Sequence, residues 1–119
     1  MAISTDVLRG HTDTVILNIL RQGDSYGYEI TKKILEASEG RIELTEATIY
    51  IAFRRMEQAG LIASYWGDGV GGARRRYYSI TQKGLATYKE HVAEWQEVNT
   101  ILNSLITGDL TYIQEDNLA

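Results

Sequence analysis

The spacing of apolar residues predicts three helices in the first half of the chain. The first covers residues 5–21, where apolar side chains recur three, four and seven positions apart and so share one face. The second begins after the capping oxygens of Asp24 and Ser25 and ends near Gly40, and the third runs from Thr45 to Ala59. The residues expected to face the core are Leu8, Val15, Ile16, Ile19, Leu20, Ile30, Ile34, Leu35, Ile49, Phe53 and Met56.

The second half of the chain has the pattern of a β-hairpin followed by one long helix. Residues 61–66 and 74–80 are rich in Tyr and β-branched side chains, and the glycine-rich residues 67–73 separate them. Thr81 is the expected cap of a helix that continues to about Ile106. Its apolar residues step by three and four positions, and they are Leu85, Tyr88, Val92, Trp95, Val98, Leu102 and Leu105. The element order therefore predicts a mainly α fold with a β-hairpin, a winged helix-turn-helix with an additional long C-terminal helix.

The distribution of charge locates a basic region that the overall composition hides. The 119 residues hold 12 Lys and Arg against 16 Asp and Glu, a net charge of -4, which argues against coating of nucleic acid or lipid through bulk charge. Residues 1–80 carry ten basic and ten acidic side chains, whereas residues 81–119 carry two basic and six acidic ones. The excess acid belongs to the last helix and the tail, which leaves room for a local basic patch in the first 80 residues.

The third helix and the hairpin hold five of the six basic residues between positions 41 and 80, and these elements approach DNA in a winged helix. On a helical wheel, the face opposite the core consists of Ala47, Ile51, Arg54, Arg55 and Gln58, with Thr48 and Tyr50 on its flanks. A small residue permits close approach to base edges, Ile51 can meet a thymine methyl group, and the arginines can reach guanine or phosphate. A solvated helix face with one stray isoleucine explains the same pattern, and the wheel does not separate the two interpretations.

The second strand of the hairpin carries a denser signal. Arg74, Arg75 and Arg76 lie next to the glycine-rich tip and are followed by Tyr77 and Tyr78. Three guanidinium groups there can bind phosphates across a groove, and the Tyr hydroxyls can add hydrogen bonds. Protection of an edge strand against aggregation accounts for one or two arginines more easily than for three. The sequence therefore favours a contact with nucleic acid at this strand.

Other chemistries find no support in the sequence. Residues 67–72 match G-x-G-x-x-G, but an arginine-rich strand follows them instead of a helix, so we interpret them as a hairpin tip. The chain has no Cys, and His11 and His91 lack the neighbours of a metal site or an acid–base pair. We expect no enzyme activity, no cofactor and no metal. The lack of a leader pattern and of a run of roughly 20 apolar residues predicts a cytoplasmic protein without membrane contact.

The predicted last helix is too long to bury its apolar seam against three short helices and a hairpin, so it needs a second surface. Apolar steps of three and four residues are typical of helix–helix pairing. We therefore expect a homodimer through this helix, assisted by the first, which presents two DNA-contacting modules to the half-sites of a palindrome. The expected interface residues are Leu8, Tyr88, Val92, Trp95, Leu102 and Leu105. From its position in the seam, Trp95 is more typical of packing than of a ligand platform.

Several segments together resemble the PadR family of bacterial transcriptional regulators. They are Thr45–Tyr50, Arg54–Glu57, Gly60–Ile62, Arg74–Thr81 with Gly84, and Tyr26–Ile30 in the second helix. The resemblance covers nearly the whole chain up to about Ile106, and it implies a DNA-binding regulator with double-stranded operator DNA as its partner. The residues then expected to contact DNA are Tyr26, Lys32, Thr45, Ala47, Thr48, Tyr50, Ile51, Arg54, Arg55, Gly72, Arg74, Arg75, Arg76 and Tyr77.

A narrower likeness, to multidrug-binding repressors of the lactococcal type, comes from residues 22–24, 36–38, 46–48 and 64–68. In such proteins the long helices dimerise, and a central Trp from each subunit stacks on flat aromatic drugs. Trp95 occupies the matching place, and this resemblance shifts its expected role from packing to ligand binding. The implied pocket comprises Val7, Thr14, Asn18, His91, Trp95, Val98 and Asn99.

Three residues depart from the pattern of those drug-binding repressors. Thr14 and Asn99 stand where the relative has an aliphatic and an acidic residue, so the likeness implies no preference for cationic drugs. Ala73 stands where the relative has a second Gly at the wing tip, which favours a stiffer tip.

The sequence thus predicts a repressor that binds a palindromic operator as a homodimer and responds to planar hydrophobic effectors at the dimer interface. Residues 1–80 would form the DNA-binding domain, residues 81–107 the dimerisation helix and residues 108–119 a flexible tail. The alternative is a winged-helix module that binds protein and has no specific affinity for DNA.

Overall fold

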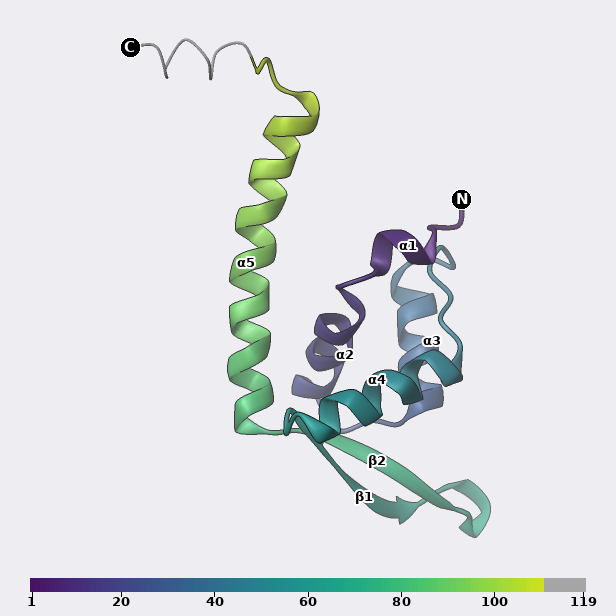
Figure 1. Ribbon diagram of the computed structural model, residues 1–119. Coiled ribbons are helices and arrows are strands. Elements are labelled where there is room, and N and C mark those ends of the chain that lie inside the picture. The colour runs from purple at the N-terminus through teal and green to yellow at the C-terminus, as the bar shows by residue number, and fades with distance from the viewer. Residues whose placement is uncertain (111–119) are drawn as a thin grey trace. The chain divides into compact units, whose positions relative to one another are not determined.

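The computed structural model describes residues 1–110, except for the side chain of Val70. The described elements follow one another in the predicted order of a winged helix-turn-helix with a long C-terminal helix (Figure 1). They are α1 (Thr5–Leu8), α2 (Thr12–Arg21), α3 (Gly27–Ala37), α4 (Glu46–Gln58), β1 (Ile62–Asp68), the 3-10 turn η1 (Val70–Gly72), β2 (Arg74–Ile80) and α5 (Gln82–Thr107). The chain forms two compact units, which divide after Tyr88, so that α5 begins in the first and continues in the second.

The prediction of one continuous helix over residues 5–21 is wrong, because residues 9–11 interrupt it. Gly10 has a φ of 89°, in the left-handed region that favours glycine, and it separates α1 from α2. The side chain of Ser4 caps α1 by accepting a hydrogen bond from the backbone N–H of Asp6 at 3.2 Å. No residue of α1 is buried, which includes Leu8, and Val15 of α2 is exposed.

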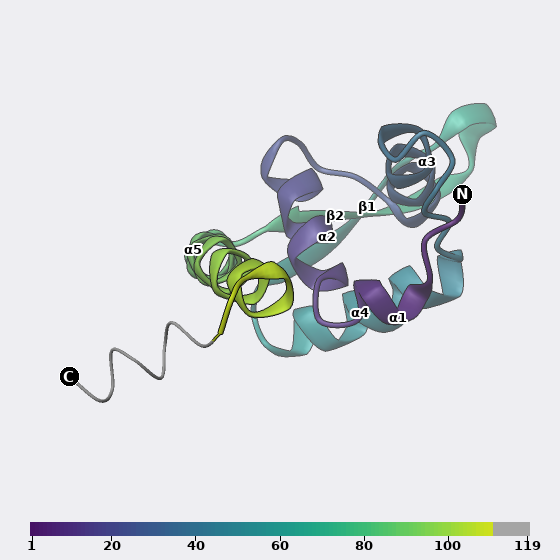
Figure 2. The same cartoon turned by 90° about the horizontal axis from the view of Figure 1, so that it is seen from above.

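The hydrophobic core of the first unit lies among α2, α3, α4 and the base of the hairpin (Figure 2). Phe53 of α4 stacks on Tyr78 of β2 with ring centroids 3.8 Å apart, which joins α4 to the hairpin. Leu17, which the sequence pattern did not place in the core, is fully buried, whereas Leu35 is only half-buried. The buried hydrophobic residues are Ile16, Leu17, Leu20, Ile30, Ile34, Ile49, Ala52, Phe53, Met56, Ile62 and Tyr78.

Ser25 has a different role from the one that the sequence suggested. The helix begins at Gly27 with Tyr26 at the N-cap position, so Ser25 does not cap it. Instead, the backbone of Ser25 forms a bridge to β2: its N–H donates to the Tyr78 carbonyl at 3.1 Å and its carbonyl accepts from Tyr78 at 2.8 Å. This bridge anchors the chain before α3 to the hairpin.

The hairpin is antiparallel, with pairing that runs from Ile62 opposite Ile80 to Asp68 opposite Arg74. The first strand continues two residues beyond the predicted end, which shortens the tip to residues 69–73. At the base, the hydroxyl of Thr81 donates to the carbonyl of Gly60 at 2.7 Å and accepts from the N–H of Gly84 at 3.0 Å. A Cβ atom at position 84 would overlap the carbonyl oxygen of Leu61, so α5 can start against the hairpin only with glycine there.

The second unit, described from Lys89 to Leu110, consists of the remainder of α5 and its end. Gly108 closes the helix by donating its N–H to the Ser104 carbonyl at 2.8 Å. Of the predicted tail, residues 111–119 lie outside the described residues. Within residues 1–110, no helix has the length and apolar character needed to cross a bilayer.

Candidate nucleic-acid interface

The N-terminus of α4 is capped as the sequence predicted. Thr45 Oγ1 accepts a hydrogen bond from the backbone N–H of Thr48 at 3.2 Å, and the two hydroxyl oxygens are 3.0 Å apart. This cap orients the helix so that Ile49, Phe53 and Met56 face the core and the opposite side faces solvent. That side bears the exposed residues Ala47, Thr48, Ile51, Arg54 and Arg55. Ile51 is 63% exposed, an arrangement that permits apolar contact with another molecule.

Two tyrosines and a glycine set how closely α3 approaches α4. A Cβ atom on the buried Gly27 would lie 3.0 Å from the ring of Tyr50, so a side chain there would force the ring aside. Tyr50 also contacts the core through an edge-to-face arrangement with Phe53, at a centroid distance of 5.9 Å.

Tyr26, directly before α3, contacts the hairpin, because its ring meets the ring of Tyr77 edge-on at a centroid distance of 5.6 Å. The predicted contact residue Lys32 lies on the exposed side of α3.

The wing places its arginines on both faces of the hairpin because β-strand side chains alternate. Arg74 and Arg76 share a face with Trp66, and their guanidinium carbons lie 5.5 and 5.9 Å from the centroid of its ring system. Arg75 is on the other face, where its guanidinium lies 4.0 Å from the centroid of Tyr26. Gly72 at the tip has a φ of 81°, which explains the glycine at this position.

The arginines of α4 and the wing differ in their partners. Arg55 forms an ion pair with Asp13 of α2, in which its Nε donates to Asp13 Oδ2 at 3.3 Å. Arg76 donates to Ser64 Oγ at 2.8 Å and lies 3.6 Å from a carboxylate oxygen of Glu57. Within residues 1–110, Arg54, Arg74 and Arg75 form no such ion pair. Three arginines therefore keep their charge available to an anion, and two are partly occupied inside the domain.

A groove with a volume of about 470 Å³ lies between the wing and the first turns of α3 and α4. Aromatic and cationic side chains line it, with Glu46 as its single carboxylate. The lining residues are Tyr26, Tyr28, Glu46, Tyr50, Trp66, Gly69, Ala73, Arg74, Arg75 and Arg76. The sequence interpretation missed Tyr28 and Trp66, which are both exposed aromatic residues. Tyr28 lies in a segment that carries the family resemblance, and Trp66 lies in one that carries the narrower likeness to drug-binding repressors.

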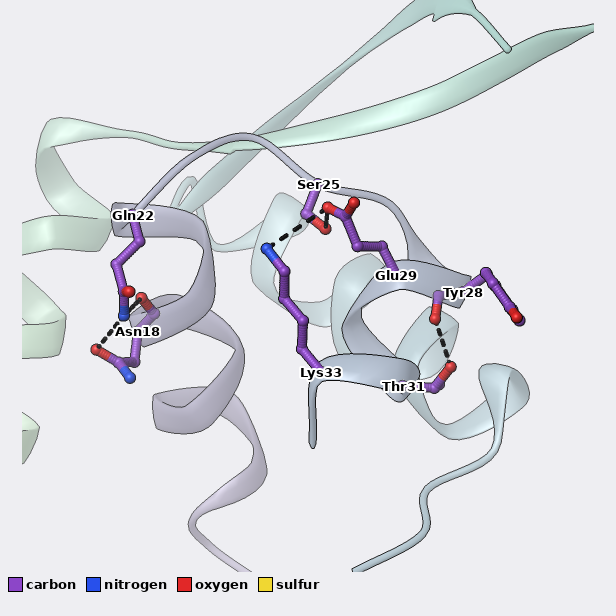
Figure 3. Close-up of polar contacts among 7 residues, drawn as sticks. All are labelled: Asn18, Gln22, Ser25, Tyr28, Glu29, Thr31 and Lys33. Carbon is purple, nitrogen blue, oxygen red and sulfur yellow. Dashed lines mark hydrogen bonds and ion pairs between the residues drawn. The ribbon is translucent and has the colours of Figure 1, made fainter. Parts of the chain in front are cut away.

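Local polar contacts connect the residues of α3 with one another and with the segment before it (Figure 3). The hydroxyl of the buried Ser25 donates to Glu29 at 2.6 Å, and Lys33 lies 3.7 Å from the same carboxylate oxygen. Thr31 donates to the Tyr28 carbonyl at 2.7 Å, a bond internal to α3. The carboxylate of Glu29 therefore connects the buried Ser25, before α3, to Lys33 on the exposed side of the helix.

Asn18, which the sequence placed in a ligand pocket, is a hydrogen-bond acceptor within the first unit. Its Oδ1 accepts from Arg21 Nε at 2.8 Å and from the hydroxyl of Tyr88 at 3.0 Å, and the side chain of Gln22 also reaches it (Figure 3). The guanidinium of Arg21 lies 5.1 Å from the Tyr88 ring centroid. Tyr88, an expected dimer residue, therefore packs against its own unit through these contacts and the core.

The remaining residues of the expected pocket and dimer interface divide between the two units. Val7 and Thr14 belong to the first unit, with Val7 exposed and Thr14 half-buried. The others are on α5 in the second unit, and they are His91, Val92, Trp95, Val98, Asn99, Leu102 and Leu105. Within that unit Val92 is half-buried, whereas Trp95, Val98, Leu102 and Leu105 are exposed.

Two tyrosines of the hairpin have raised pKa values. The hydrogen bond from Tyr65 to Asp24, 2.6 Å long, is the main cause of the raised pKa of the Tyr65 hydroxyl, because ionisation would remove the donor. Burial raises the pKa of Tyr78. Both hydroxyls stay protonated at neutral pH and leave the charge of the interface to its arginines. The described residues contain no cluster of His, Asp or Glu able to hold a metal ion.

Comparison with known proteins identifies the fold and the class of protein together. A family model described as the transcriptional regulator PadR-like family matches residues 16–90, which span α2 to α5. The chain belongs to the PadR-like family of transcriptional regulators. As a PadR-like protein it is a winged-helix DNA-binding regulator and not an enzyme.

Individual relatives of this PadR-like chain cover most of its length. Uncharacterized protein X of Lysinibacillus sphaericus is 39% identical over 106 residues, which is 89% of this chain and 97% of that protein. A transcriptional regulator of Clostridium thermocellum is 42% identical, with a TM-score of 0.81, and the match covers 89% of this chain and 100% of the other. A PadR family regulator of Clostridium difficile is 38% identical, with a TM-score of 0.72, over 82% of this chain and 99% of the other.

Proposed function

We propose that this PadR-like protein is a repressor that recognises its operator through the exposed side of α4 and holds the adjacent phosphates with its wing. The observation that carries the proposal is the set of arginines that form no ion pair within residues 1–110. They are Arg54 on the exposed side of α4, and Arg74 and Arg75 of β2, which line the groove. An α-helix with small and polar outward residues enters the major groove, where Arg can bind guanine and Ile51 can contact a thymine methyl group. The wing arginines would supply sequence-independent affinity.

The occupant that we propose for the exposed apolar side of α5 is a second copy of the chain. Trp95, Val98, Leu102 and Leu105 follow one another at steps of three, four and three residues, the heptad spacing of paired helices. All four are exposed within the second unit, and Leu102 is 44% exposed. A two-fold symmetric pair would present two α4 helices to the half-sites of a palindromic operator.

The same pair of helices supports a role for small planar hydrophobic effectors. Trp95 lies in the middle of the apolar side and is 45% exposed, so two copies would bring two indole rings to one interface. An aromatic ligand that stacks there can change the distance between the two α4 helices of the dimer only if it binds one arrangement of the dimer better than the other. Such a regulator would act in the cytoplasm, where its operator is.

The DNA proposal is tested by fluorescence anisotropy with labelled duplexes that tile the region upstream of the protein's own gene. We expect affinity that falls steeply with salt, because each neutralised phosphate contributes roughly 0.9 to the slope of log K against log salt. Arg74→Ala should lower that slope by about 1 for every DNA sequence, whereas Arg54→Ala should mainly reduce discrimination between duplexes. Arg9→Ala is the matched control, since Arg9 is an exposed arginine directly after α1 that pairs with Asp6 of that helix.

Two results would contradict this proposal. One is a wild type that binds every duplex with the same affinity, and the other is an Arg74→Ala variant that keeps the wild-type affinity and salt slope. A weak dependence on salt would instead favour the alternative of a winged-helix module that binds protein.

A further inference from the structure

Trp66 is the one large aromatic side chain of β1 that shares a face with two wing arginines. It lies opposite Arg76 in the antiparallel register, and Arg74 is two residues further along the same face. The guanidinium carbons of Arg74 and Arg76 lie 5.5 and 5.9 Å from the centroid of its ring system. Its side chain is 55% exposed and lines the groove beside the recognition helix. The hairpin of β1 and β2, to which it belongs, projects from the helices (Figure 1).

Core packing does not explain this tryptophan. The contact that joins the hairpin to the core is the stack of Phe53 on Tyr78, at the base of the wing. Trp66 lies beyond that stack, toward the tip, in a stretch of β1 with no buried residue. The exposed indole ring of Trp66 therefore has its contacts outside the core. In the structure these contacts are with the guanidinium groups of Arg74 and Arg76.

The two arginines that flank Trp66 use their N–H groups differently. Arg76 donates to Ser64 Oγ, and the hydroxyl of Ser64 donates in turn to Glu57 at 2.7 Å. The N–H groups of Arg76 are therefore directed toward the domain. Arg74 forms no ion pair within residues 1–110. A guanidinium over an aromatic ring interacts through its flat face, which leaves the N–H groups at its edge available to a phosphate. Contact with Trp66 can therefore order Arg74 without consuming its donors.

We propose that Trp66 is a positioning residue of the DNA interface, which holds the guanidinium of Arg74 at the mouth of the groove so that its N–H groups meet a backbone phosphate. This inference rests on the proposed function of the wing, which is to hold DNA phosphates with its arginines. A long side chain that is ordered before binding loses less rotational freedom when the complex forms. Trp66 thus increases the contribution of Arg74 without adding a charge of its own.

The test combines four variants in the anisotropy assay on the upstream duplexes: Trp66→Leu, Trp66→Phe, Arg74→Ala and the double variant Trp66→Leu/Arg74→Ala. We expect Trp66→Leu to weaken binding about three- to five-fold, the range of an exposed cation–π contact. Trp66→Phe should recover most of that loss. In the Arg74→Ala background, Trp66→Leu should have little further effect, since Arg74 is the residue through which Trp66 acts, and the donors of Arg76 are directed to Ser64. The salt slope should stay at the wild-type value in Trp66→Leu, because the number of phosphate contacts is unchanged.

Tyr65→Leu is the matched control for a general loosening of the wing. Tyr65 is the preceding residue of β1 and is also half-exposed, but it lies on the opposite face, stacked on Tyr77 and bonded to Asp24. We expect Tyr65→Leu to change affinity less than two-fold. Thermal melting of every variant checks that the domain is folded.

Three outcomes would overturn the inference while leaving the proposed function intact: wild-type affinity in Trp66→Leu, losses that add fully in the double variant, or an equal loss in Tyr65→Leu. A wild type that binds none of the duplexes would overturn the proposed function, and this inference with it. Coupled losses with rescue by Trp66→Phe support both.

Discussion

Residues 1–88 and residues 89–110 differ in where their apolar side chains lie. The first unit has a buried hydrophobic core among three helices and a hairpin. The second consists of one helix and its end, with Trp95, Leu102 and Leu105 among the residues that it leaves exposed. A hydrophobic core stabilises a domain by its own contacts, whereas an exposed apolar stripe contributes only when another surface covers it. The core of the first unit therefore supports folding, whereas the proposed assembly would use the second unit.

The acidic charge follows the same division. Residues 89–119 hold one basic and six acidic side chains, whereas residues 1–88 hold eleven basic and ten acidic ones, with Arg74 and Arg75 beside the groove. An acidic surface is repelled by phosphates, so charge favours an orientation in which the first unit faces DNA.

Truncation inside the core of the first unit should have the largest effect. Leu17→Ala removes a fully buried side chain, and we expect it to lower the free energy of unfolding by about 2–5 kcal/mol. Val15→Ala on the same helix is the control, because Val15 is exposed and its truncation should cost less than about 1 kcal/mol. Urea denaturation followed by circular dichroism measures both. Equal losses of stability in the two variants would contradict the burial of Leu17 and the exposure of Val15.

A charge on the apolar side of α5 should have the next largest effect, and it should act on assembly. Leu102→Glu places a carboxylate where the proposed partner helix would cover it, and we expect dimer affinity to fall at least about a hundred-fold, or ~2.7 kcal/mol. Thr100→Glu adds the same charge about 160° around the helix and should leave the dimer intact. Analytical ultracentrifugation at micromolar concentration distinguishes the variants. A wild type that sediments as a monomer would sink the proposed assembly.

Replacement of Trp95 should have the smallest of the three effects, and it is measured on ligand binding. Titration with a flat neutral aromatic such as riboflavin, in a Trp66→Phe background where Trp95 is the sole tryptophan, should quench its fluorescence. Trp95→Ala should weaken binding about three- to ten-fold, the scale of one aromatic stack. Isothermal calorimetry measures the affinity of the variant that lacks the fluorophore. Unchanged affinity in Trp95→Ala would retire the stacking proposal.

Local sequence signals account well for the elements that carry the candidate site. Thr45 followed by Ile49, Phe53 and Met56 predicted α4 together with its cap and its buried side, and the structure confirms all three. The glycine-rich segment between two Tyr-rich runs predicted the hairpin. These signals act within a few residues of the chain, because a cap or an amphipathic turn involves neighbours three or four positions apart.

Other features escaped the sequence interpretation because neighbouring elements decide them. Leu17 follows the buried Ile16 on α2, and both are covered because α2 contacts α4 on one side and β2 on another. One apolar stripe cannot represent a helix that is covered on two sides. The role of Ser25 depends on its bridge to Tyr78, far along the chain. Gly10 could have indicated the end of the first helix, but the apolar spacing continues across it, so the sequence interpretation did not place a break there.

Composition and spacing along the chain are sufficient to establish a winged helix with arginines on its contact elements and a long apolar helix after it. Which arginines keep their charge for a partner depends on folding. Arg55 meets Asp13 across 42 positions and Arg76 meets Ser64 across 12, whereas Arg74 meets the ring of Trp66. Local spacing specifies helices and strands because their hydrogen bonds and buried sides repeat over a few residues. Ion pairs and ring contacts between elements have no such period, so they emerge only when packing brings distant segments together.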